Sequence, residues 1–194
     1  MKVTDSPNGN DAQGFIDANK TDDYTYDLNG NFKTDANKKI TTIIYNHLNL
    51  PIKITFEKTG NIVYIYNALG QKLEKIVTQN TTVSSTNLTN TNYLGGYQYL
   101  KPNSGTWALQ FFPTAEGYVK NSVINSANNY SYVFNYTDHL GNIRLSYSDA
   151  DKNGTIATTE IIEENNYYPF GLKHSGYNEY PATSNKYKYN SKEY

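Results

Sequence analysis

Apolar and polar residues alternate through several short segments of the chain. In residues 52–57 (IKITFE) the two isoleucines and the phenylalanine fall on one side of an extended backbone, and the polar residues fall on the other. The same period of two recurs in residues 130–136 (YSYVFNY), where the aromatic residues share a face, and in residues 143–147 (IRLSY). The pattern predicts β-strands with one packed face each. The only helix it allows is a short one over residues 113–121 (PTAEGYVKN).

Turn-forming residues separate these segments and recur in a common frame. The frame begins with Tyr, continues with Asn, Asp or Thr, and reaches a Leu that is next to Gly or Asn. It is found in residues 26–32 (YDLNGNF), 45–51 (YNHLNLP), 66–73 (YNALGQKL) and 136–145 (YTDHLGNIRL). The first three copies begin about 20 residues apart, a period that predicts stacked hairpin units, each too small to bury its own face. We therefore predict an all-β fold of consecutive antiparallel hairpins that form a curved sheet.

The chain divides into four parts by composition. Residues 1–23 form a polar lead-in that we expect to be loosely ordered, and residues 24–77 contain the first hairpins. Residues 78–92 (TQNTTVSSTNLTNTN) have little to bury, so we predict a polar loop at the surface or a long polar hairpin. The aromatic pattern returns at residue 93 and continues to residue 194.

Composition narrows the classes of function. The net charge of −1 gives no basic excess for nucleic acid, and the absence of cysteine excludes disulfides and thiolate chemistry. No apolar run resembles a signal peptide or a membrane span of about 20 residues. We expect either a cytoplasmic protein or a piece of a longer exported chain.

Residues 149–160 (DADKNGTIATTE) match the spacing of a calcium-binding loop. Such a loop has oxygen ligands at its first, third and fifth positions, then a glycine, a carbonyl donor and a final glutamate. The ligands here would be Asp149, Asp151, Asn153, the carbonyl of Thr155, and Glu160. However, predicted strands rather than helices flank the segment, and Asp-Lys-Asn-Gly is a common turn. Two interpretations stay open: a plain hairpin turn, or a turn that also binds a structural Ca²⁺.

Other polar groups give weaker signals. The acidic segment 17–23 (DANKTDD) lacks the spacing of a metal loop and favours a solvated loop. Asp138 and His139 lie in the turn frame with no serine fixed beside them, and the adjacent Glu163 and Glu164 point to opposite faces of a strand. We therefore predict no catalytic residues. The 20 tyrosines leave carbohydrate binding open as a second use of the aromatic surface.

Several of these segments together resemble a known family. The motifs YDLNGN, YNALGQKL, YLGGYQY, FFPTAEGY, YTDHLGNIRLSY, NNYYPFGL and YKYNSKEY are similar to those of YD/RHS-repeat proteins, in particular to the RHS repeat-associated core of bacterial secreted proteins. The resemblance covers about residues 20–194. It implies a ribbon of β-sheet that spirals into part of a hollow shell around a C-terminal toxin or effector. The family's autoproteolytic aspartates follow the last motif, so no catalytic residue is carried over to this chain.

The resemblance sets the functional expectation. We predict a structural, non-enzymatic segment of an RHS-type shell in a longer secreted or cell-surface protein. Its partners would be neighbouring repeats and a C-terminal effector domain. The alternative is a calcium-stabilised adhesin or carbohydrate-binding module of the cell surface.

Overall fold

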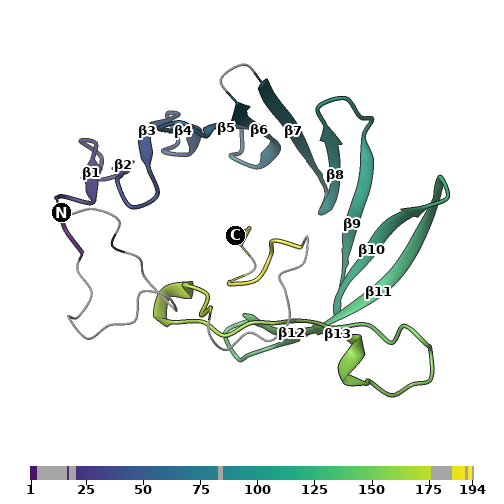
Figure 1. The fold of residues 1–194 in the computed structure, drawn as a ribbon. Coiled ribbons are helices and arrows are strands. Elements are labelled where there is room, and N and C mark those ends of the chain that lie inside the picture. The colour runs from purple at the N-terminus through teal and green to yellow at the C-terminus, as the bar shows by residue number, and fades with distance from the viewer. Residues whose placement is uncertain (4–16, 18–20, 83–84, 176–184, 191, 194) are drawn as a thin grey trace. The chain divides into compact units, whose positions relative to one another are not determined.

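The computed structural model describes residues 1–3, 17, 21–82, 85–175, 185–190, 192 and 193. Most of the predicted lead-in therefore lies outside the described residues. Within them, the chain forms thirteen β-strands and two short 3₁₀ turns, and no α-helix (Figure 1). The strands are β1 (Tyr24–Tyr26), β2 (Phe32–Asp35), β3 (Ile40–Tyr45), β4 (Pro51–Phe56), β5 (Gly60–Tyr66), β6 (Lys72–Thr82), β7 (Ser85–Leu94), β8 (Tyr97–Pro102), β9 (Ala108–Thr114), β10 (Gly117–Ile124), β11 (Ala127–Thr137), β12 (Ile143–Tyr147) and β13 (Ile161–Glu164). The 3₁₀ turns are η2 (Thr158–Glu160) and η3 (Pro169–Gly171).

The strands form one antiparallel sheet in which the order in space equals the order in sequence. Each strand thus pairs with the strand that follows it, which confirms the prediction of consecutive hairpins. Contacts divide the described chain into two compact units, with the boundary inside β9, after Gln110. Unit 1 contains β1–β8, and unit 2 contains β10–β13 with the C-terminal segment.

Two segments with ambiguous sequence signals both form hairpins. Residues 78–82 and 85–92 belong to β6 and β7, which pair as a long polar hairpin, one of the two forms that the sequence allowed. The short helix predicted over residues 113–121 is wrong. These residues form the end of β9, a tight turn and the start of β10, and Gly117 pairs with Thr114 across the turn. Alternating side chains on paired strands outweigh the weak helical signal there.

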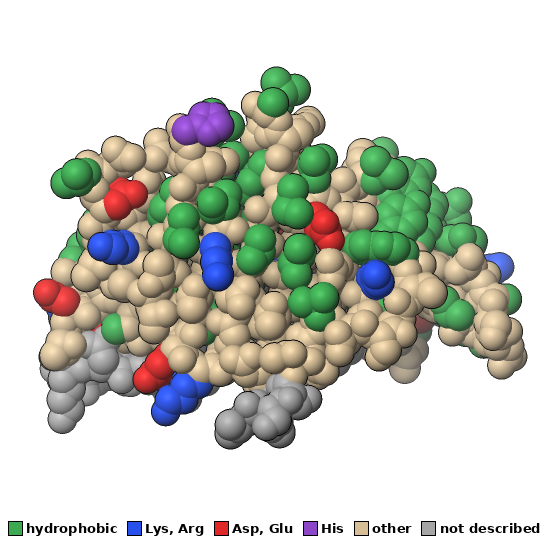
Figure 2. Space-filling view, turned by 90° about the horizontal axis from the view of Figure 1, so that it is seen from above, with side chains coloured by type: hydrophobic (Ala, Val, Ile, Leu, Met, Phe, Trp, Pro, Cys, Tyr) green, Lys and Arg blue, Asp and Glu red, His purple; other side chains and the backbone are tan. Residues whose placement is uncertain are grey.

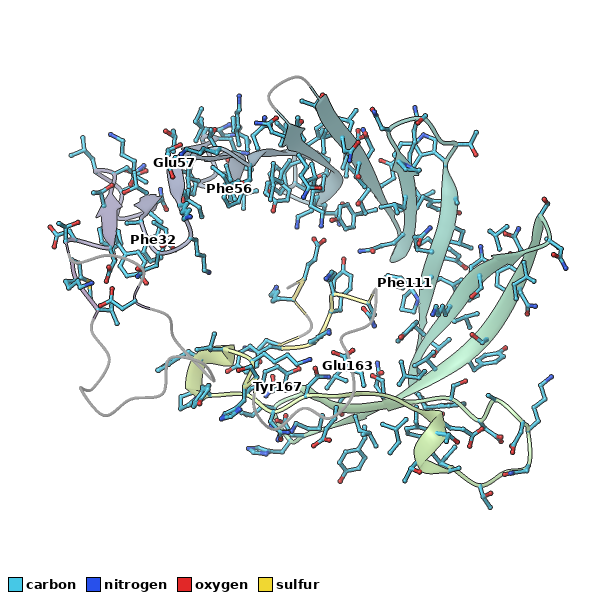
Figure 3. The ribbon with its side chains drawn as sticks, viewed as in Figure 1. Phe32, Phe56, Glu57, Phe111, Glu163 and Tyr167 are labelled. Atoms are coloured by element: carbon cyan, nitrogen blue, oxygen red, sulfur yellow. The ribbon has the colours of Figure 1, made fainter. Side chains whose placement is uncertain are left out.

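The core of unit 2 is small and aromatic. Phe111, Tyr118 and Val133 are buried together, with Ile162 and Tyr187 packed against them. The sheet leaves many apolar side chains exposed, and hydrophobic groups lie among polar ones on the face turned to the viewer in Figure 2. Unit 1 also carries aromatic side chains on its strands, such as Phe32 on β2 and Phe56 on β4 (Figure 3).

Four turns between paired strands share one geometry, which explains the common sequence frame. In each, the side chain of the first residue accepts hydrogen bonds from the backbone amides two and four residues later at 2.9–3.0 Å. The fourth residue has a positive φ, between 57° and 82°. Glycine adopts this conformation freely and asparagine tolerates it. The first residues are Asp27, Asn46, Asn67 and Asp138, and the fourth are Gly30, Asn49, Gly70 and Gly141.

Tyrosine hydroxyls link successive turns. Tyr45 donates a hydrogen bond to the carbonyl of Phe32 at 2.7 Å, and Tyr66 donates one to the carbonyl of Pro51 at 3.0 Å. Each tyrosine directly precedes a turn, and each acceptor directly follows the turn before it. Tyr167 repeats the contact with the carbonyl of Ile143 at 2.9 Å. Tyr45 and Tyr66 of the frame, and Tyr167 before a later turn, therefore each tie one turn to an earlier one.

Replacing Tyr45 by phenylalanine is expected to lower the free energy of unfolding by about 1 kcal/mol, because one hydrogen bond between neighbouring units is lost. Urea denaturation measures the effect. Tyr26→Phe is the matched control, since the Tyr26 hydroxyl contacts only the Met1 sulfur at 3.6 Å among described partners. Equal stability losses in the two variants would contradict a linking role for Tyr45.

We expect the fold to lose stability in acid, because a turn aspartate is stabilised in its ionised form. Hydrogen bonds from the side chain of Asn142 and from backbone amides lower the pKa of Asp138 below its ordinary value. A lowered pKa in the folded state means that the stabilisation is complete above the ordinary pKa and is lost as pH falls through the lowered one. Asp138→Asn keeps an oxygen for the two amides, as Asn46 and Asn67 do, but cannot titrate. We expect this variant to lose less stability between pH 6 and pH 3 than the wild type, as measured by urea denaturation at each pH. An unchanged pH dependence would contradict the assignment.

Candidate functional site

The segment 185–190 is fixed inside unit 2, and we call it the C-terminal latch. Its Tyr187 ring packs edge-on against Phe111, with the ring centroids 6.2 Å apart, and so joins the core. The backbone carbonyl of Lys188 accepts a hydrogen bond from the amide of Ile143 at 2.9 Å, and the amide of Asn190 donates to the side-chain oxygen of Asn142 at 3.0 Å. The latch is therefore held by β9, by β12 and by the turn that precedes β12.

A second aromatic contact holds the latch against η3. The Tyr189 ring lies 5.4 Å from the Tyr167 ring. Gly171 has a φ of +91°, and a Cβ atom there would lie 2.6 Å from the Tyr189 ring. A glycine is therefore favoured at position 171 for two reasons: the positive φ, and the close contact with the Tyr189 ring of the latch.

A buried ionic cluster joins the latch to β13. Lys188 pairs with Glu163 on β13, and Lys173 approaches the same carboxylate oxygen at 3.1 Å. The side chains of Glu163 and Lys188 are 2% and 6% exposed. Burial lowers the pKa of Lys188, and its hydrogen bond with Glu163 opposes that change. Figure 3 labels three of the residues that the latch contacts, namely Phe111, Glu163 and Tyr167.

The latch brings together three motifs that are distant in sequence. Asn142 belongs to DHLGN, Gly171 to YYPFG, and Lys188 to YKYN. Other buried polar residues gather in the same unit, namely Asn121, Ser146, Asn165 and Asn185. Unit 2 therefore buries several polar side chains in addition to its small aromatic core.

The acidic loop lies between β12 and β13, as the sequence predicts. One carboxylate oxygen from each of Asp149, Asp151 and Glu160 lies within 4.8 Å of the others, so these groups could hold a metal ion. Asp149 accepts hydrogen bonds from the amides of Asn153 and Gly154 at 3.1 and 3.0 Å. The loop backbone thus places the first predicted ligands around one point.

The remaining predicted ligands are also within the loop. The side-chain oxygen of Asn153 accepts hydrogen bonds from the amide and hydroxyl of Thr155. Glu160 is 9% exposed and accepts hydrogen bonds from the amides of Ala157, Ala150 and Asp151 at 3.0, 2.6 and 3.3 Å. The amide of Ala157 is the main reason that the pKa of Glu160 is lowered. The carboxylate therefore stays ionised at neutral pH, the form that a cation requires.

The other predicted polar groups have structural contacts. Asp17 and Asp23, from the second acidic segment, pair with Lys2 at 2.5 and 3.3 Å. Asp138 holds its turn, while Glu163 is in the ionic cluster and Glu164 accepts a hydrogen bond from Asn166 at 3.1 Å. The pairing of Glu163 with Lys188 is not evident from the sequence, because these residues lie 25 positions apart with no local motif that links them.

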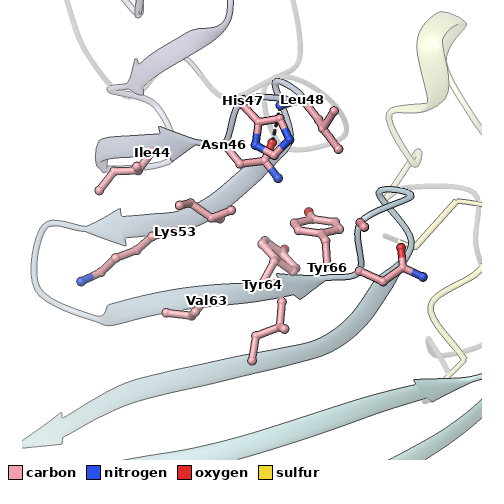
Figure 4. A pocket seen from close by; sticks show the side chains of 12 residues that line it. Ile44, Asn46, His47, Leu48, Lys53, Val63, Tyr64 and Tyr66 are labelled. Atoms are coloured by element: carbon pink, nitrogen blue, oxygen red, sulfur yellow. Dashed lines mark hydrogen bonds between the residues drawn. The ribbon is translucent and has the colours of Figure 1, made fainter.

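Unit 1 has a pocket of about 600 Å³ on β3–β5 (Figure 4). Its lining is mostly apolar, and includes Ile44, Val63 and Tyr64, with His47 from a turn at its margin. The turn fixes this margin, because the side-chain oxygen of Asn46 accepts a hydrogen bond from the backbone amide of Leu48 at 2.9 Å. Lys53 and His47 are the charged or basic side chains of this lining, and none of the described residues that line it has a side-chain carboxylate.

Comparison with known proteins rests on structure alone. No family model and no curated protein matches the sequence. The structure is similar to the crystal structure of TcdB2–TccC3–Cdc42, with a TM-score of 0.66 and 16% identity over 87% of this chain and 8% of that chain. The fold of this chain is therefore similar to that of a part of the TcdB2–TccC3 β-shell. The resemblance drawn from the sequence motifs is thus confirmed at the level of the fold.

Two further structures agree. The crystal structure of TcdB2–TccC3 matches with a TM-score of 0.55 at 14% identity, over 80% of this chain and 8% of that chain. The Tc holotoxin pore of Photorhabdus luminescens, with the TccC3 mutation D651A, matches with a TM-score of 0.53 at 15% identity, over 76% and 7%. The chain spans less than a tenth of the length of each of these matched chains. No helix in the described part of the chain is long and apolar enough to cross a membrane.

Proposed function

We propose that the chain is a structural, non-catalytic segment of an RHS-type β-shell that encloses or presents a C-terminal effector in a larger secreted or cell-surface protein. The observation that carries the proposal is the repeated turn with its linking tyrosine. The first two turns each accept the same hydrogen bond from the tyrosine that precedes the next turn, an arrangement that further copies could extend. The similarity to the TcdB2–TccC3 shell over most of the chain supports the same role.

The C-terminal latch gives this segment a specific task in the shell. A shell that releases an effector needs a fixed point from which the effector chain departs. The latch supplies such a point, because its aromatic, ionic and backbone contacts hold the chain against three separate motifs. The neighbouring repeats and the effector domain are the partners that this role requires.

The reading frame around this chain tests the proposal. We expect further copies of the turn frame to be encoded on the N-terminal side and a domain of unrelated sequence beyond the YKYN motif. The purified full product should form hollow particles in electron micrographs. A frame that encodes neither neighbour, or a full product without an enclosed space, would overturn the proposal.

We also propose that the acidic loop binds Ca²⁺ through Asp149, Asp151, Asn153, the carbonyl of Thr155, and Glu160. Three carboxylates that converge on one point repel each other, and a divalent cation would relieve this repulsion. The role would be to stabilise the connection between β12 and β13, which is consistent with a structural function.

Calorimetric titration checks this prediction. Ca²⁺ is expected to bind the wild-type chain with a dissociation constant of about 1 mM or tighter and to raise its thermal midpoint. Asp149→Ala should abolish both effects, whereas Glu57→Gln, which removes an exposed carboxylate from unit 1, should leave both unchanged. Binding that is equal in the wild type and Asp149→Ala would contradict the proposed site.

A further inference from the structure

The second strand of the β10–β11 hairpin carries a row of aromatic side chains on its outward face. Tyr130, Tyr132 and Tyr136 are 53%, 64% and 67% exposed, and Phe134 lies between them and stacks on Tyr147 with the ring centroids 5.6 Å apart. We call these four residues of β11 the aromatic strip. The sequence pattern predicted that this face would be packed, but the structure shows the reverse. The buried residue of β11 is Val133, which points to the opposite face and is 2% exposed.

We propose that the aromatic strip binds a neutral glycan chain. Side chains two residues apart on a strand are separated by about 6.6–6.8 Å, a distance on the scale of one sugar residue. Tyrosine suits this ligand because its ring stacks on the apolar face of a sugar while its hydroxyl stays in water. The inference does not rest on the proposed role in a shell.

A pocket at the turn between β9 and β10 gives the strip a polar anchor. It has a volume of about 370 Å³ and is lined by Tyr132, Phe134, Thr114, Ala115 and Glu116. Two aromatic rings with a carboxylate and a hydroxyl beside them provide both stacking and hydrogen bonds for sugar hydroxyls. Among the described residues, Glu116 forms no ion pair that would neutralise its carboxylate.

Charge selects the class of glycan. Between Gly117 and Thr137 the only charged side chain is Lys120. Its cross-strand partner Ser131 alternates with Tyr130 and Tyr132, which places Lys120 on the opposite face. The strip therefore offers no cation to a sulfated or uronic-acid chain, and Glu116 repels such chains. The chemistry favours neutral, extended polysaccharides over nucleic acids and acidic glycans.

Titrations with defined oligosaccharides test the inference. The probes are cellohexaose, chitohexaose and laminarihexaose as neutral chains, and a heparin hexasaccharide as an acidic one, each followed by amide chemical shifts of the full chain. At least one neutral probe is expected to bind and to shift amides of β11. Tyr132→Ala should weaken that binding at least tenfold, and Glu116→Gln should weaken it less. Tyr97→Ala, an exposed tyrosine of unit 1, is the matched control and should bind as the wild type does.

Three outcomes would overturn the inference. The first is that no neutral hexasaccharide binds the wild type. The second is that heparin binds more tightly than the neutral chains, and the third is that Tyr132→Ala changes the oligomeric state of the chain while sugar binding stays unchanged. If Tyr132→Ala fails to fold, Glu116→Gln and Tyr136→Ala serve instead, since Tyr136 is the most exposed member of the strip. Unaltered affinity in both of these variants would equally overturn the inference.

Discussion

Replacement of Glu163 by glutamine is expected to lower the free energy of unfolding by about 3–5 kcal/mol, because it leaves Lys188 charged and buried without a counter-ion. Glu163 and Lys188 are almost completely shielded from solvent, so water cannot replace the lost partner. Lys173 shares the same carboxylate and would also lose its ion pair. The measurement is urea denaturation at pH 7 with a probe in unit 2.

A double variant tests whether the unpaired charge of Lys188 causes the loss of stability. Lys188→Met in the Glu163→Gln background removes the unpaired charge, so the double variant should be more stable than Glu163→Gln alone. Glu164→Gln is the matched control, since its carboxylate accepts one hydrogen bond from Asn166 and forms no ion pair with a described residue. If Glu163→Gln costs no more than Glu164→Gln, the buried cluster does not hold the latch.

Proteolysis can detect whether the latch opens separately from the sheet. Loss of the ion pair should expose the latch before the sheet unfolds, since β12 and β13 keep their own ladder of paired residues. Limited proteolysis of Glu163→Gln is therefore expected to cut within the latch while the strands of unit 2 stay intact. Simultaneous cleavage throughout unit 2 would show instead that the latch and the sheet unfold together.

The strands and turns could be predicted because they depend on local chemistry. The side chain of Asn67, for example, accepts hydrogen bonds from the backbone amides two and four residues later. Gly70, three residues after Asn67, adopts a positive φ. Such contacts recur with the sequence frame wherever the same residues occur. The acidic loop could be predicted for the same reason, since Asp149 and Glu160 are placed by a single connection between two strands.

The ionic cluster and the orientation of β11 could not be predicted, because they depend on contacts between distant segments. Alternation in YSYVFNY shows that two faces exist, but not which of them is buried. The core already contains Phe111 and Tyr118 on the side of Val133, so the aromatic side chains of β11 face outward. Similarly, Lys188 looks like any surface lysine until the latch places it on Glu163.

Replacement of Gly117 by alanine is expected to destabilise unit 2 by about 3 kcal/mol, at the upper end of the range for an overpacked site. A Cβ atom on Gly117 would overlap the carbonyl oxygen of Val133 and lie 3.0 Å from its carbonyl carbon. Both are backbone atoms of β11, so relief requires the β10–β11 ladder to separate where Gly117 pairs with Phe134. Because Val133 belongs to the core, such a shift also disturbs the packing of Phe111 and Tyr118.

A second glycine variant distinguishes this clash from the general cost of replacing glycine. Gly95 has a φ of +57°, and a Cβ atom there would have no neighbouring atom within 4 Å, so Gly95→Ala carries only the conformational cost of about 1–2 kcal/mol. Urea denaturation gives the loss of stability for each variant, and amide hydrogen exchange locates it. We expect faster exchange along β10 and β11 in Gly117→Ala alone. Should Gly117→Ala prove no less stable than Gly95→Ala, the close approach of β10 and β11 at Gly117 would be refuted. The absence of a side chain at Gly117 therefore allows β10 and β11 to approach closely beside Val133.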